Sequence, residues 1–313
     1  MKVVSTPSEL RSMSKSVVLA VGFFDGVHRG HQEVILSAVK RAEENSGEAW
    51  VMTFDRHPLS FLAPYKRPRL LSTTEERLDL FCELGIDGVL LVEFNAEIAD
   101  QSPEEFVRWL CGDVKGSVGI VEICCGDNWR FGRYAAGTPA LLAGFGKEYG
   151  FDVAVVPYAD FKGVEISSTR IRCAIREGRL EEVNNMLGRK YSVHGTVVAG
   201  RGIGNRLKMA TANIIPDVDL LPPCGVYAVR VKIGASVYGG AANLGVRPTF
   251  ADTSPDEIVL ETHLFDFDEE IYGQNIIVSF VAFIRGEKKF DSSEKLVGQV
   301  RKDLKRAADV LKG

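Results

Sequence analysis

The stretch VVLAVGFFDGVHRGH, which runs from Val17 to His31, decides how the first half of the chain folds. Its first five residues are all apolar, which is typical of a strand buried on both faces of a parallel sheet. Gly22 and Gly26 then allow a tight turn, and from about Arg29 the apolar residues follow helical spacing. The stretch therefore predicts a strand, a glycine turn and a helix. The helix N-terminus presents free backbone N–H groups and the positive end of the helix dipole, and both suit a phosphate group.

Two imidazoles stand at this predicted helix start. His28 and His31 are three residues apart, with Gly30 between them. Residues at this spacing share one face of a helical turn, so both rings could donate to one phosphate. Gly30 leaves room for a nucleotide to approach the backbone closely. The pair could instead be two surface residues or two ligands of a metal site, although no cysteine or carboxylate cluster accompanies it at zinc-site spacing.

Length and composition limit the remaining possibilities. A chain of 313 residues favours about two domains, and 45% hydrophobic and 26% charged residues are ordinary for a globular protein. The formal charge of −4 argues against a nucleic-acid partner. No apolar run approaches the roughly 18 residues of a membrane span, and the N-terminus lacks the apolar core of a signal peptide. The six cysteines form no C-x-x-C pair, which is typical of reduced residues in a cytoplasmic protein.

Strands alternate with helices over the first half of the chain, and this predicts a parallel sheet covered on both faces. Cys124 and Cys125 are neighbours in one predicted strand, so their side chains point to opposite faces and cannot easily share a metal ion. We therefore interpret both as packing residues. Strands are predicted at 17–21, 49–54, 88–92, 118–125 and 151–157, and helical patterns lie between them, among them 75–84 and 139–149.

The pattern changes after a short predicted helix at 180–188. Strands then follow one another without intervening helices, which predicts an antiparallel barrel. An amphipathic helix is expected at the end of the chain, over 293–311. We accordingly predict an amino-terminal domain at residues 1–187 and a carboxyl-terminal domain at 188–313. The barrel strands are expected at 191–200, 226–233, 237–242, 258–267 and 276–284.

Two loops of the first half carry candidate ligand contacts. His57 follows the strand at 49–54, at the sheet edge where open α/β folds bind ligands, although it could be an ordinary loop residue before a proline. The loop GDNWRFG, at 126–132, offers Asn128 to hydrogen-bond a planar heterocycle and Trp129 or Phe131 to stack on it. The alternative is a loop whose aromatic residues anchor it in the core.

A third candidate is the segment ISSTRIR, at 166–172. Ser168 and Thr169 stand at a predicted helix start and are followed by Arg170 and Arg172. Hydroxyl groups, helix N–H groups and an arginine together suit an anion. An ordinary Ser/Thr helix cap is the alternative.

These motifs resemble those of known enzyme families. GFFDGVHRGH and ISSTRIR resemble the two signatures of the HxGH nucleotidyltransferases, and most closely those of bacterial FMN adenylyltransferases. In the second half, ATANI, NLGVRPTF and LETHLFDFDEEIYG resemble signatures of bacterial-type riboflavin kinases, with Ala210 in place of the usual proline. The chain as a whole therefore resembles the bifunctional riboflavin kinase/FMN adenylyltransferases, the prokaryotic-type FAD synthetases.

The resemblance implies two reactions. The carboxyl-terminal domain would transfer the γ-phosphate of ATP to the 5′-hydroxyl of riboflavin and make FMN. The amino-terminal domain, a Rossmann-like nucleotidyltransferase, would join FMN to the AMP part of ATP, releasing pyrophosphate and making FAD. Riboflavin, FMN, FAD and ATP would be its partners. Three alternatives stay open: a monofunctional FMN adenylyltransferase whose second domain only binds flavin, a nucleotidyltransferase for another phosphate ester, and a flavin-binding regulator. The oligomeric state also stays open.

The resemblance also implies roles for individual residues. Glu261 would be the base of the kinase reaction, and His28 and His31 would be catalytic in adenylyl transfer. Thr211 and Asn213 offer neutral oxygens that suit a Mg²⁺ ion keeping most of its waters. Asn128 and Trp129 would bind flavin. The residues expected at the nucleotide and its phosphates are Gly22, Asp25, Gly30, His57, Ser168, Thr169 and Arg172.

Overall fold

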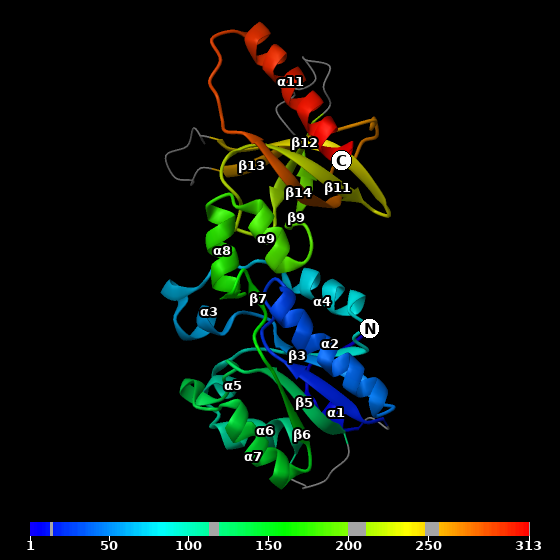
Figure 1. Cartoon of the computed structure of the whole chain (residues 1–313), viewed down its shortest axis with the longest axis vertical. Helices are drawn as coiled ribbons and strands as arrows, with labels where there is room; N and C mark the ends of the chain where they lie inside the picture. The colour runs from blue at the N-terminus through cyan, green and yellow to red at the C-terminus, as the bar shows by residue number, and fades with distance from the viewer. Residues whose placement is uncertain (13–14, 113–118, 200–210, 248–256, 313) are drawn as a thin grey trace. The chain divides into compact units, whose positions relative to one another are not determined.

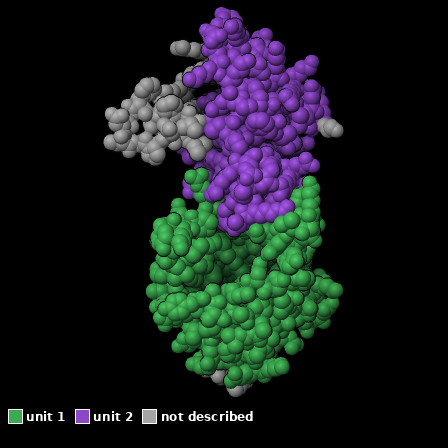
Figure 2. Space-filling model, turned by 60° about the vertical axis from the view of Figure 1, so that its left-hand side comes forward, with its two compact units in different colours: residues 1–168 green, residues 169–313 purple. Residues whose placement is uncertain are grey.

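The computed structural model describes residues 1–12, 15–112, 119–199, 211–247 and 257–312 of the 313-residue chain. The chain divides into two compact units, residues 1–168 and 169–313, which Figure 2 draws in different colours. Each unit contains a sheet and a core of its own. Within the described ranges, no helix is both long and apolar enough to cross a membrane.

Unit 1 is built on a six-stranded sheet in which all pairings are parallel, as predicted (Figure 1). The strand order β1-β4-β3-β2-β5-β6 places β2 between β3 and β5. All five residues of β2 are buried, as its apolar run predicts. β1 was not predicted, because a strand of three residues shows no periodicity. The strands are β1 Lys2–Val4, β2 Val17–Val21, β3 Glu48–Phe54, β4 Gly88–Val92, β5 Ile120–Gly126 and β6 Asp152–Val156.

Helices cover both faces of this sheet. The apolar side of α2, Arg29–Glu44, packs on one face, and α6, Pro103–Cys111, packs on the other (Figure 1). Sequence signals set the helix starts, since Thr73 and Ser102 each cap a helix and form a capping box. The remaining helices and the small hairpin of unit 1 are α1 Pro7–Arg11, α3 Pro58–Leu62, η1 Pro64–Lys66, α4 Thr74–Glu83, α5 Ala96–Asp100, η2 Arg133–Ala135, α7 Pro139–Tyr149, β7 Asp160–Phe161 and β8 Val164–Glu165.

The two adjacent cysteines of β5 lie in different cores. Cys124 belongs to the core beneath α2, and Cys125 belongs to the core beneath α6. Burial raises the pKa of the Cys124 thiol to about 11 and that of Cys125 to about 12. Both thiols are therefore protonated packing groups, as the alternation of side chains along a strand predicts.

Unit 2 contains a closed six-stranded barrel with antiparallel pairing throughout, in the order β10-β13-β12-β11-β14-β9. The predicted antiparallel barrel is thus confirmed. β10 was not predicted, because its six residues TANIIP show too little alternation. The strands are β9 Ser192–Val198, β10 Thr211–Pro216, β11 Gly225–Ile233, β12 Ser236–Arg247, β13 Glu257–Leu264 and β14 Asn275–Arg285.

Among the described residues of unit 2, three helices accompany the barrel. α8, Ser168–Arg176, starts at the last residue of unit 1, and α9, Leu180–Leu187, packs against β14. The predicted final helix is α11, Ser293–Lys312, whose Ala307 is fully buried against the barrel. The barrel residues beneath α11 include Ala228 and Ala241, and these mark its outer surface.

Candidate functional site

The turn after β2 is held in shape by a buried carboxylate. Asp25 is only 3% exposed, and its Oδ1 accepts hydrogen bonds from the backbone N–H groups of Leu71 at 2.9 Å and Ser72 at 3.2 Å. The backbone N–H of Gly26 donates to Ser72 Oγ at 2.9 Å. Gly26 adopts a φ of +76°, which favours glycine. The turn is therefore fixed to the 71–72 segment before any ligand is bound.

His28 and His31 meet at the N-terminus of α2. His28 is the N-cap, and its Nδ1 accepts a hydrogen bond from the backbone N–H of His31 at 3.3 Å. A neutral His28 then carries its proton on Nε2, which can donate to an anion. The two rings are stacked, with centroids 3.5 Å apart. A Cβ placed on Gly30 would lie 3.4 Å from the His28 ring, an ordinary contact, so packing alone does not require glycine there.

A buried arginine that was not predicted connects the strand ends at this site. The Arg77 guanidinium donates to the carbonyl oxygens of Phe23 at 2.7 Å and Phe54 at 2.9 Å, just beyond β2 and at the end of β3. It also donates to Thr53 Oγ1 at 2.9 Å and Thr74 Oγ1 at 3.0 Å. Burial lowers the pKa of Arg77 to about 10. The sequence carries no signal for this role, since an arginine on an amphipathic helix is usually solvated.

His57 lies beyond the carboxyl end of β3, next to the turn after β2. It caps α3, and its Nδ1 accepts a hydrogen bond from the backbone N–H of Leu59 at 3.1 Å. The rings of His57 and Phe23 are in edge-to-face contact, with their centroids 4.8 Å apart. As in His28, Nδ1 is the acceptor, so a neutral ring carries its proton on Nε2.

The loop at 126–132 follows β5, the other neighbour of β2. Trp129 and Phe131 stack with ring centroids 4.7 Å apart, and Phe131 is buried beside Phe106 of α6. Phe131 therefore anchors the loop in the core, while Trp129 is half-buried. Asn128 is exposed, and its Nδ2 donates to Glu165 Oε1 of β8 at 3.0 Å. Because β2, β3 and β5 are parallel neighbours, the loops that follow them gather at one edge of the sheet.

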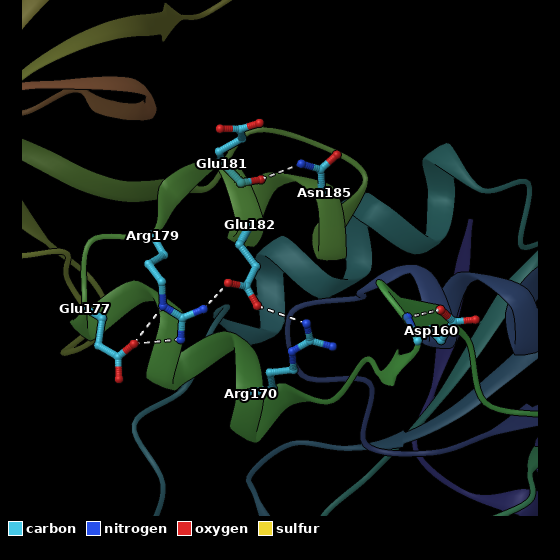
Figure 3. Close-up of polar contacts among 8 residues, drawn as sticks. Asp160, Arg170, Glu177, Arg179, Glu181, Glu182 and Asn185 are labelled. Carbon is cyan, nitrogen blue, oxygen red and sulfur yellow. Dashed lines mark hydrogen bonds and ion pairs between the residues drawn. The ribbon is translucent and has the colours of Figure 1, made fainter.

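The ISSTRIR segment starts α8. Ser168 Oγ donates to the carbonyl oxygen of Asp25 at 3.1 Å, which joins the start of this helix to the turn after β2. Within unit 2, Thr169 is exposed and Arg172 is buried three residues further along α8. The other arginine of the segment, Arg170, donates to Glu182 of α9 at 3.0 Å (Figure 3). Glu182 also pairs with Arg179 (Figure 3).

The barrel brings three predicted residues together on one face. Asn213 of β10 lies directly opposite Glu261 of β13, and Glu261 lies opposite Asn243 of β12. Thr211 is two residues before Asn213 and shares its face. Directly paired residues of an antiparallel sheet have neighbouring side chains, so one row carries Asn213, Glu261 and Asn243.

This row lies on the outside of the barrel. Ala241, two residues before Asn243 on β12, packs beneath α11, whereas the alternate residues Ile214 and Leu260 are fully buried. Asn213 is 6% exposed, and Glu261 is half-buried. Ala210, the residue that replaces the usual proline, lies outside the described residues.

Comparisons with known proteins cover both units. The family described as FAD synthetase matches residues 10–170, and the family described as riboflavin kinase matches residues 187–311. A Bacillus subtilis protein named bifunctional riboflavin kinase/FMN adenylyltransferase is 35% identical over 93% of this chain and 91% of its own length. An Escherichia coli protein of the same name is 35% identical over 91% of this chain and 90% of its own.

A solved structure from Streptococcus pneumoniae resembles the fold of the whole chain. It is described as a macrolide-efflux protein, is 30% identical and superposes with a TM-score of 0.84. The match covers 96% of each chain, so both units of the present fold have counterparts in it.

Proposed function

The chain belongs to the family of bifunctional riboflavin kinase/FMN adenylyltransferases, and from this membership we propose which residues carry out each reaction. The enzyme phosphorylates riboflavin to FMN and adenylylates FMN to FAD, with ATP as co-substrate in both steps. Matches to both families over their respective halves confirm the prediction of two activities over the monofunctional alternative.

Adenylyl transfer needs no protein nucleophile, because the phosphate of FMN attacks the α-phosphate of ATP and pyrophosphate leaves. The protein has to hold the two anionic substrates together and stabilise the charge that develops on the transferred phosphoryl group. We assign this role to the Nε2–H of His28, to His31 and to the N-terminus of α2. The hydrogen bond from His31 N to His28 Nδ1 supports the assignment, because it places the ring of His28 at the first turn of α2, beside the N–H groups of the helix N-terminus.

Other predicted residues bind or position the nucleotide. Asp25 acts by shaping the turn, since its carboxylate already accepts backbone hydrogen bonds and would repel a phosphate. Gly30 leaves room for the nucleotide, and His57 contributes a donor. A Cβ placed on Gly22 would lie 2.8 Å from the ring of Phe24, so Gly22 acts by admitting that ring beside the turn. Ser168, Thr169 and Arg172 at the start of α8 bind phosphate oxygens, an assignment supported by their match to the second family signature.

Asn128 and Trp129 bind the flavin ring in the adenylylation step. The exposed amide of Asn128 offers hydrogen bonds to the heterocycle, and the half-buried indole of Trp129 offers a face for stacking.

The kinase reaction needs a base near the 5′-hydroxyl of riboflavin. We assign this role to Glu261, which stands beside Asn213 on the outer face of the barrel. The hydroxyl of Thr211 and the amide oxygen of Asn213 are hard, neutral ligands of the kind that Mg²⁺ accepts. Mg²⁺ would supply charge neutralisation on the phosphates of ATP.

The functional boundary that we propose follows residue 187. The two compact units meet after residue 168. Thr169 and Arg172 nevertheless belong to the nucleotidyltransferase signature, so the adenylyltransferase must extend beyond that point. We also propose a cytoplasmic location, because the six cysteines are free thiols, of which Cys124 and Cys125 are buried packing residues.

The assignment is tested by separating the two reactions. Wild-type enzyme and two variants, His28→Ala/His31→Ala and Glu261→Gln, are incubated with riboflavin, ATP and Mg²⁺, and flavins are resolved by chromatography. We expect the histidine variant to stop at FMN. The Glu261→Gln variant should make no FMN from riboflavin but should make FAD from supplied FMN. Near wild-type FAD formation by the histidine variant, or riboflavin phosphorylation by Glu261→Gln, would overturn the respective assignment.

A further inference from the structure

A second carboxylate lies on the same outer face of the barrel as Glu261. Glu287 follows the end of β14, and its Oε1 would lie 2.8 Å from a Cβ placed on Gly245 of β12. The same Cβ would lie 3.5 Å from Asn243 Nδ2. The carboxylate and the amide thus stand together over one end of β12. A Cβ at position 245 would require the end of the Glu287 side chain to shift.

The pairing of β12 with β13 relates this carboxylate to the proposed base. Asn243 and Gly245 are two residues apart and share a face, and Asn243 lies directly opposite Glu261. Neighbouring strands are separated by about 4.8 Å, so Glu287 lies roughly one to two strand spacings from Glu261. The ribityl chain of riboflavin, which has five carbon atoms, can extend over such a distance.

The end of β14, two residues before Glu287, is anchored by a partly buried ion pair. Arg285 donates to Asp303 of α11 through Nη2 at 2.7 Å and through Nε at 3.0 Å. Gln299 Nε2 donates to Asp303 Oδ1 at 2.9 Å, and Arg285 Nη1 donates to the carbonyl oxygen of Gly286 at 2.8 Å. Asp303 is only 5% exposed. A hydrogen-bonded ion pair holds its partners in one geometry, so the backbone that leads to Glu287 is anchored to α11, while the carboxylate of Glu287 is exposed beside β12.

We propose that Glu287 binds riboflavin in the kinase reaction, its carboxylate accepting a hydrogen bond from a neutral donor of the flavin. The inference rests on the assignment of Glu261 as the base that faces the 5′-hydroxyl. A carboxylate repels the phosphates of ATP, so it belongs on the side of the uncharged substrate. The amide nitrogen of Asn243 beside it disfavours a metal ion at that spot. Riboflavin offers two kinds of donor, the hydroxyls of its ribityl chain and the imide N–H of its ring.

The test measures riboflavin binding directly, by titrating the fluorescence of the flavin in the presence of ADP and Mg²⁺. Glu287→Gln keeps the shape of the side chain and removes its charge. A hydrogen bond to a charged group is worth about ten- to a hundredfold in affinity, so Kd and KM for riboflavin should rise by about that factor. The KM for ATP should stay the same. FAD formation from FMN, which uses unit 1, is the internal control.

Two further variants make the result specific. Glu181→Gln removes an exposed carboxylate of α9 that points away from the network around Glu182 (Figure 3), and it should leave riboflavin binding unchanged. Gly245→Ala should weaken riboflavin binding as Glu287→Gln does, and the double variant should be no weaker than either single one, because both remove one contact. Circular dichroism and thermal unfolding establish that each variant is folded.

Binding of a second ligand, lumiflavin, identifies which group of the flavin donates the hydrogen bond to Glu287. Lumiflavin has the ring but no ribityl chain. If Glu287→Gln weakens lumiflavin binding as much as riboflavin binding, the ring imide is the donor; if only riboflavin binding weakens, the donor is a ribityl hydroxyl. An unchanged riboflavin Kd, or a raised Mg²⁺ requirement without a change in riboflavin binding, would overturn the proposal. Because binding is measured without turnover, this outcome is distinct from a failure of Glu261 as the base.

Discussion

The imidazole of His28 stacks on that of His31, with ring planes only 20° from parallel and centroids 3.5 Å apart. The spacing of the two histidines led us to expect them on one helical turn, but His28 lies just outside α2 as its N-cap. Its ring therefore performs two tasks. Nδ1 caps the helix, and we propose that the same ring also binds the substrate phosphates.

These two tasks can be separated by substitution. Asparagine is among the best N-cap residues, so His28→Asn should keep the cap and lose the imidazole Nε2–H. We expect both His28→Asn and His28→Ala to slow FAD formation by about a hundred- to a thousandfold. Only the alanine variant should lose about 1 kcal/mol of unfolding free energy, measured with urea. A His28→Asn enzyme with a normal rate would show that His28 only caps α2.

We expect even a lysine in place of Arg77 to destabilise the protein. Its guanidinium donates to the carbonyl oxygens of Phe23 and Phe54 and to two threonine hydroxyls, and a single ammonium group cannot reach all four acceptors. We expect Arg77→Lys to lower the unfolding free energy by about 1–3 kcal/mol, because buried acceptors lose their donors.

The Arg77→Lys variant should also form FAD more slowly, because Phe23 precedes the turn that carries His28. Riboflavin phosphorylation by unit 2 is the control and should not change. Wild-type stability in this variant would contradict the positioning role.

The cysteines should divide cleanly by reactivity. Burial raises the pKa of Cys111 and Cys125 to about 12 and that of Cys124 to about 11, so these thiols are protonated at pH 8, and those of Cys124 and Cys125 are also covered. Cys82 and Cys173 are exposed. We expect iodoacetamide to modify Cys82 first and Cys173 more slowly, because its hydrogen bond to Glu177 raises the pKa of the Cys173 thiol. Peptide mass spectrometry measures this, and rapid modification of Cys124 in folded protein would contradict the packing of β5.

The elements that the sequence predicts are those with a continuous apolar run or a long periodic pattern. β2 is a five-residue apolar run and α11 a twenty-residue amphipathic helix, and both are present where expected. The sequence predicts neither β1, which has only three residues, nor β10, whose six residues show too little alternation. Local patterns predict local structure, so short elements are recognised only when their partners are known.

Contacts between residues that are far apart in the chain could not be predicted from the sequence. Arg77 binds a carbonyl oxygen 54 residues away, and nothing near it in the chain distinguishes it from a solvated arginine. The pairing of Asn213 with Glu261 depends on strand register, and a slip of one residue would have placed them on opposite faces. The motifs indicated which residues matter, and the register of the barrel determines which of them meet.

The last prediction concerns where the adenylyltransferase ends. α9 packs against β14 of the barrel, and its Val183, Met186 and Leu187 are fully buried. The backbone N–H of Tyr191, just beyond α9, donates to Asn184 Oδ1 at 2.7 Å. A fragment of residues 1–187 therefore exposes apolar side chains that the whole chain covers, each worth roughly 1.5–3 kcal/mol of burial. It nevertheless keeps α8 with the phosphate ligands that we propose, whereas a fragment of residues 1–168 lacks them.

Comparing the two fragments tests whether α8 belongs to the adenylyltransferase. Both should show the circular dichroism of a folded α/β sheet, because all six parallel strands precede residue 157. We expect fragment 1–187 to make FAD from FMN and ATP, and fragment 1–168 to be at least about a hundredfold slower, because it lacks the donors of Thr169 and Arg172. Replacing Val183 and Met186 by serine and glutamine in the longer fragment should improve its solubility without changing the rate. Equal rates for two folded fragments would place the functional boundary at residue 168 and remove α8 from the nucleotide site.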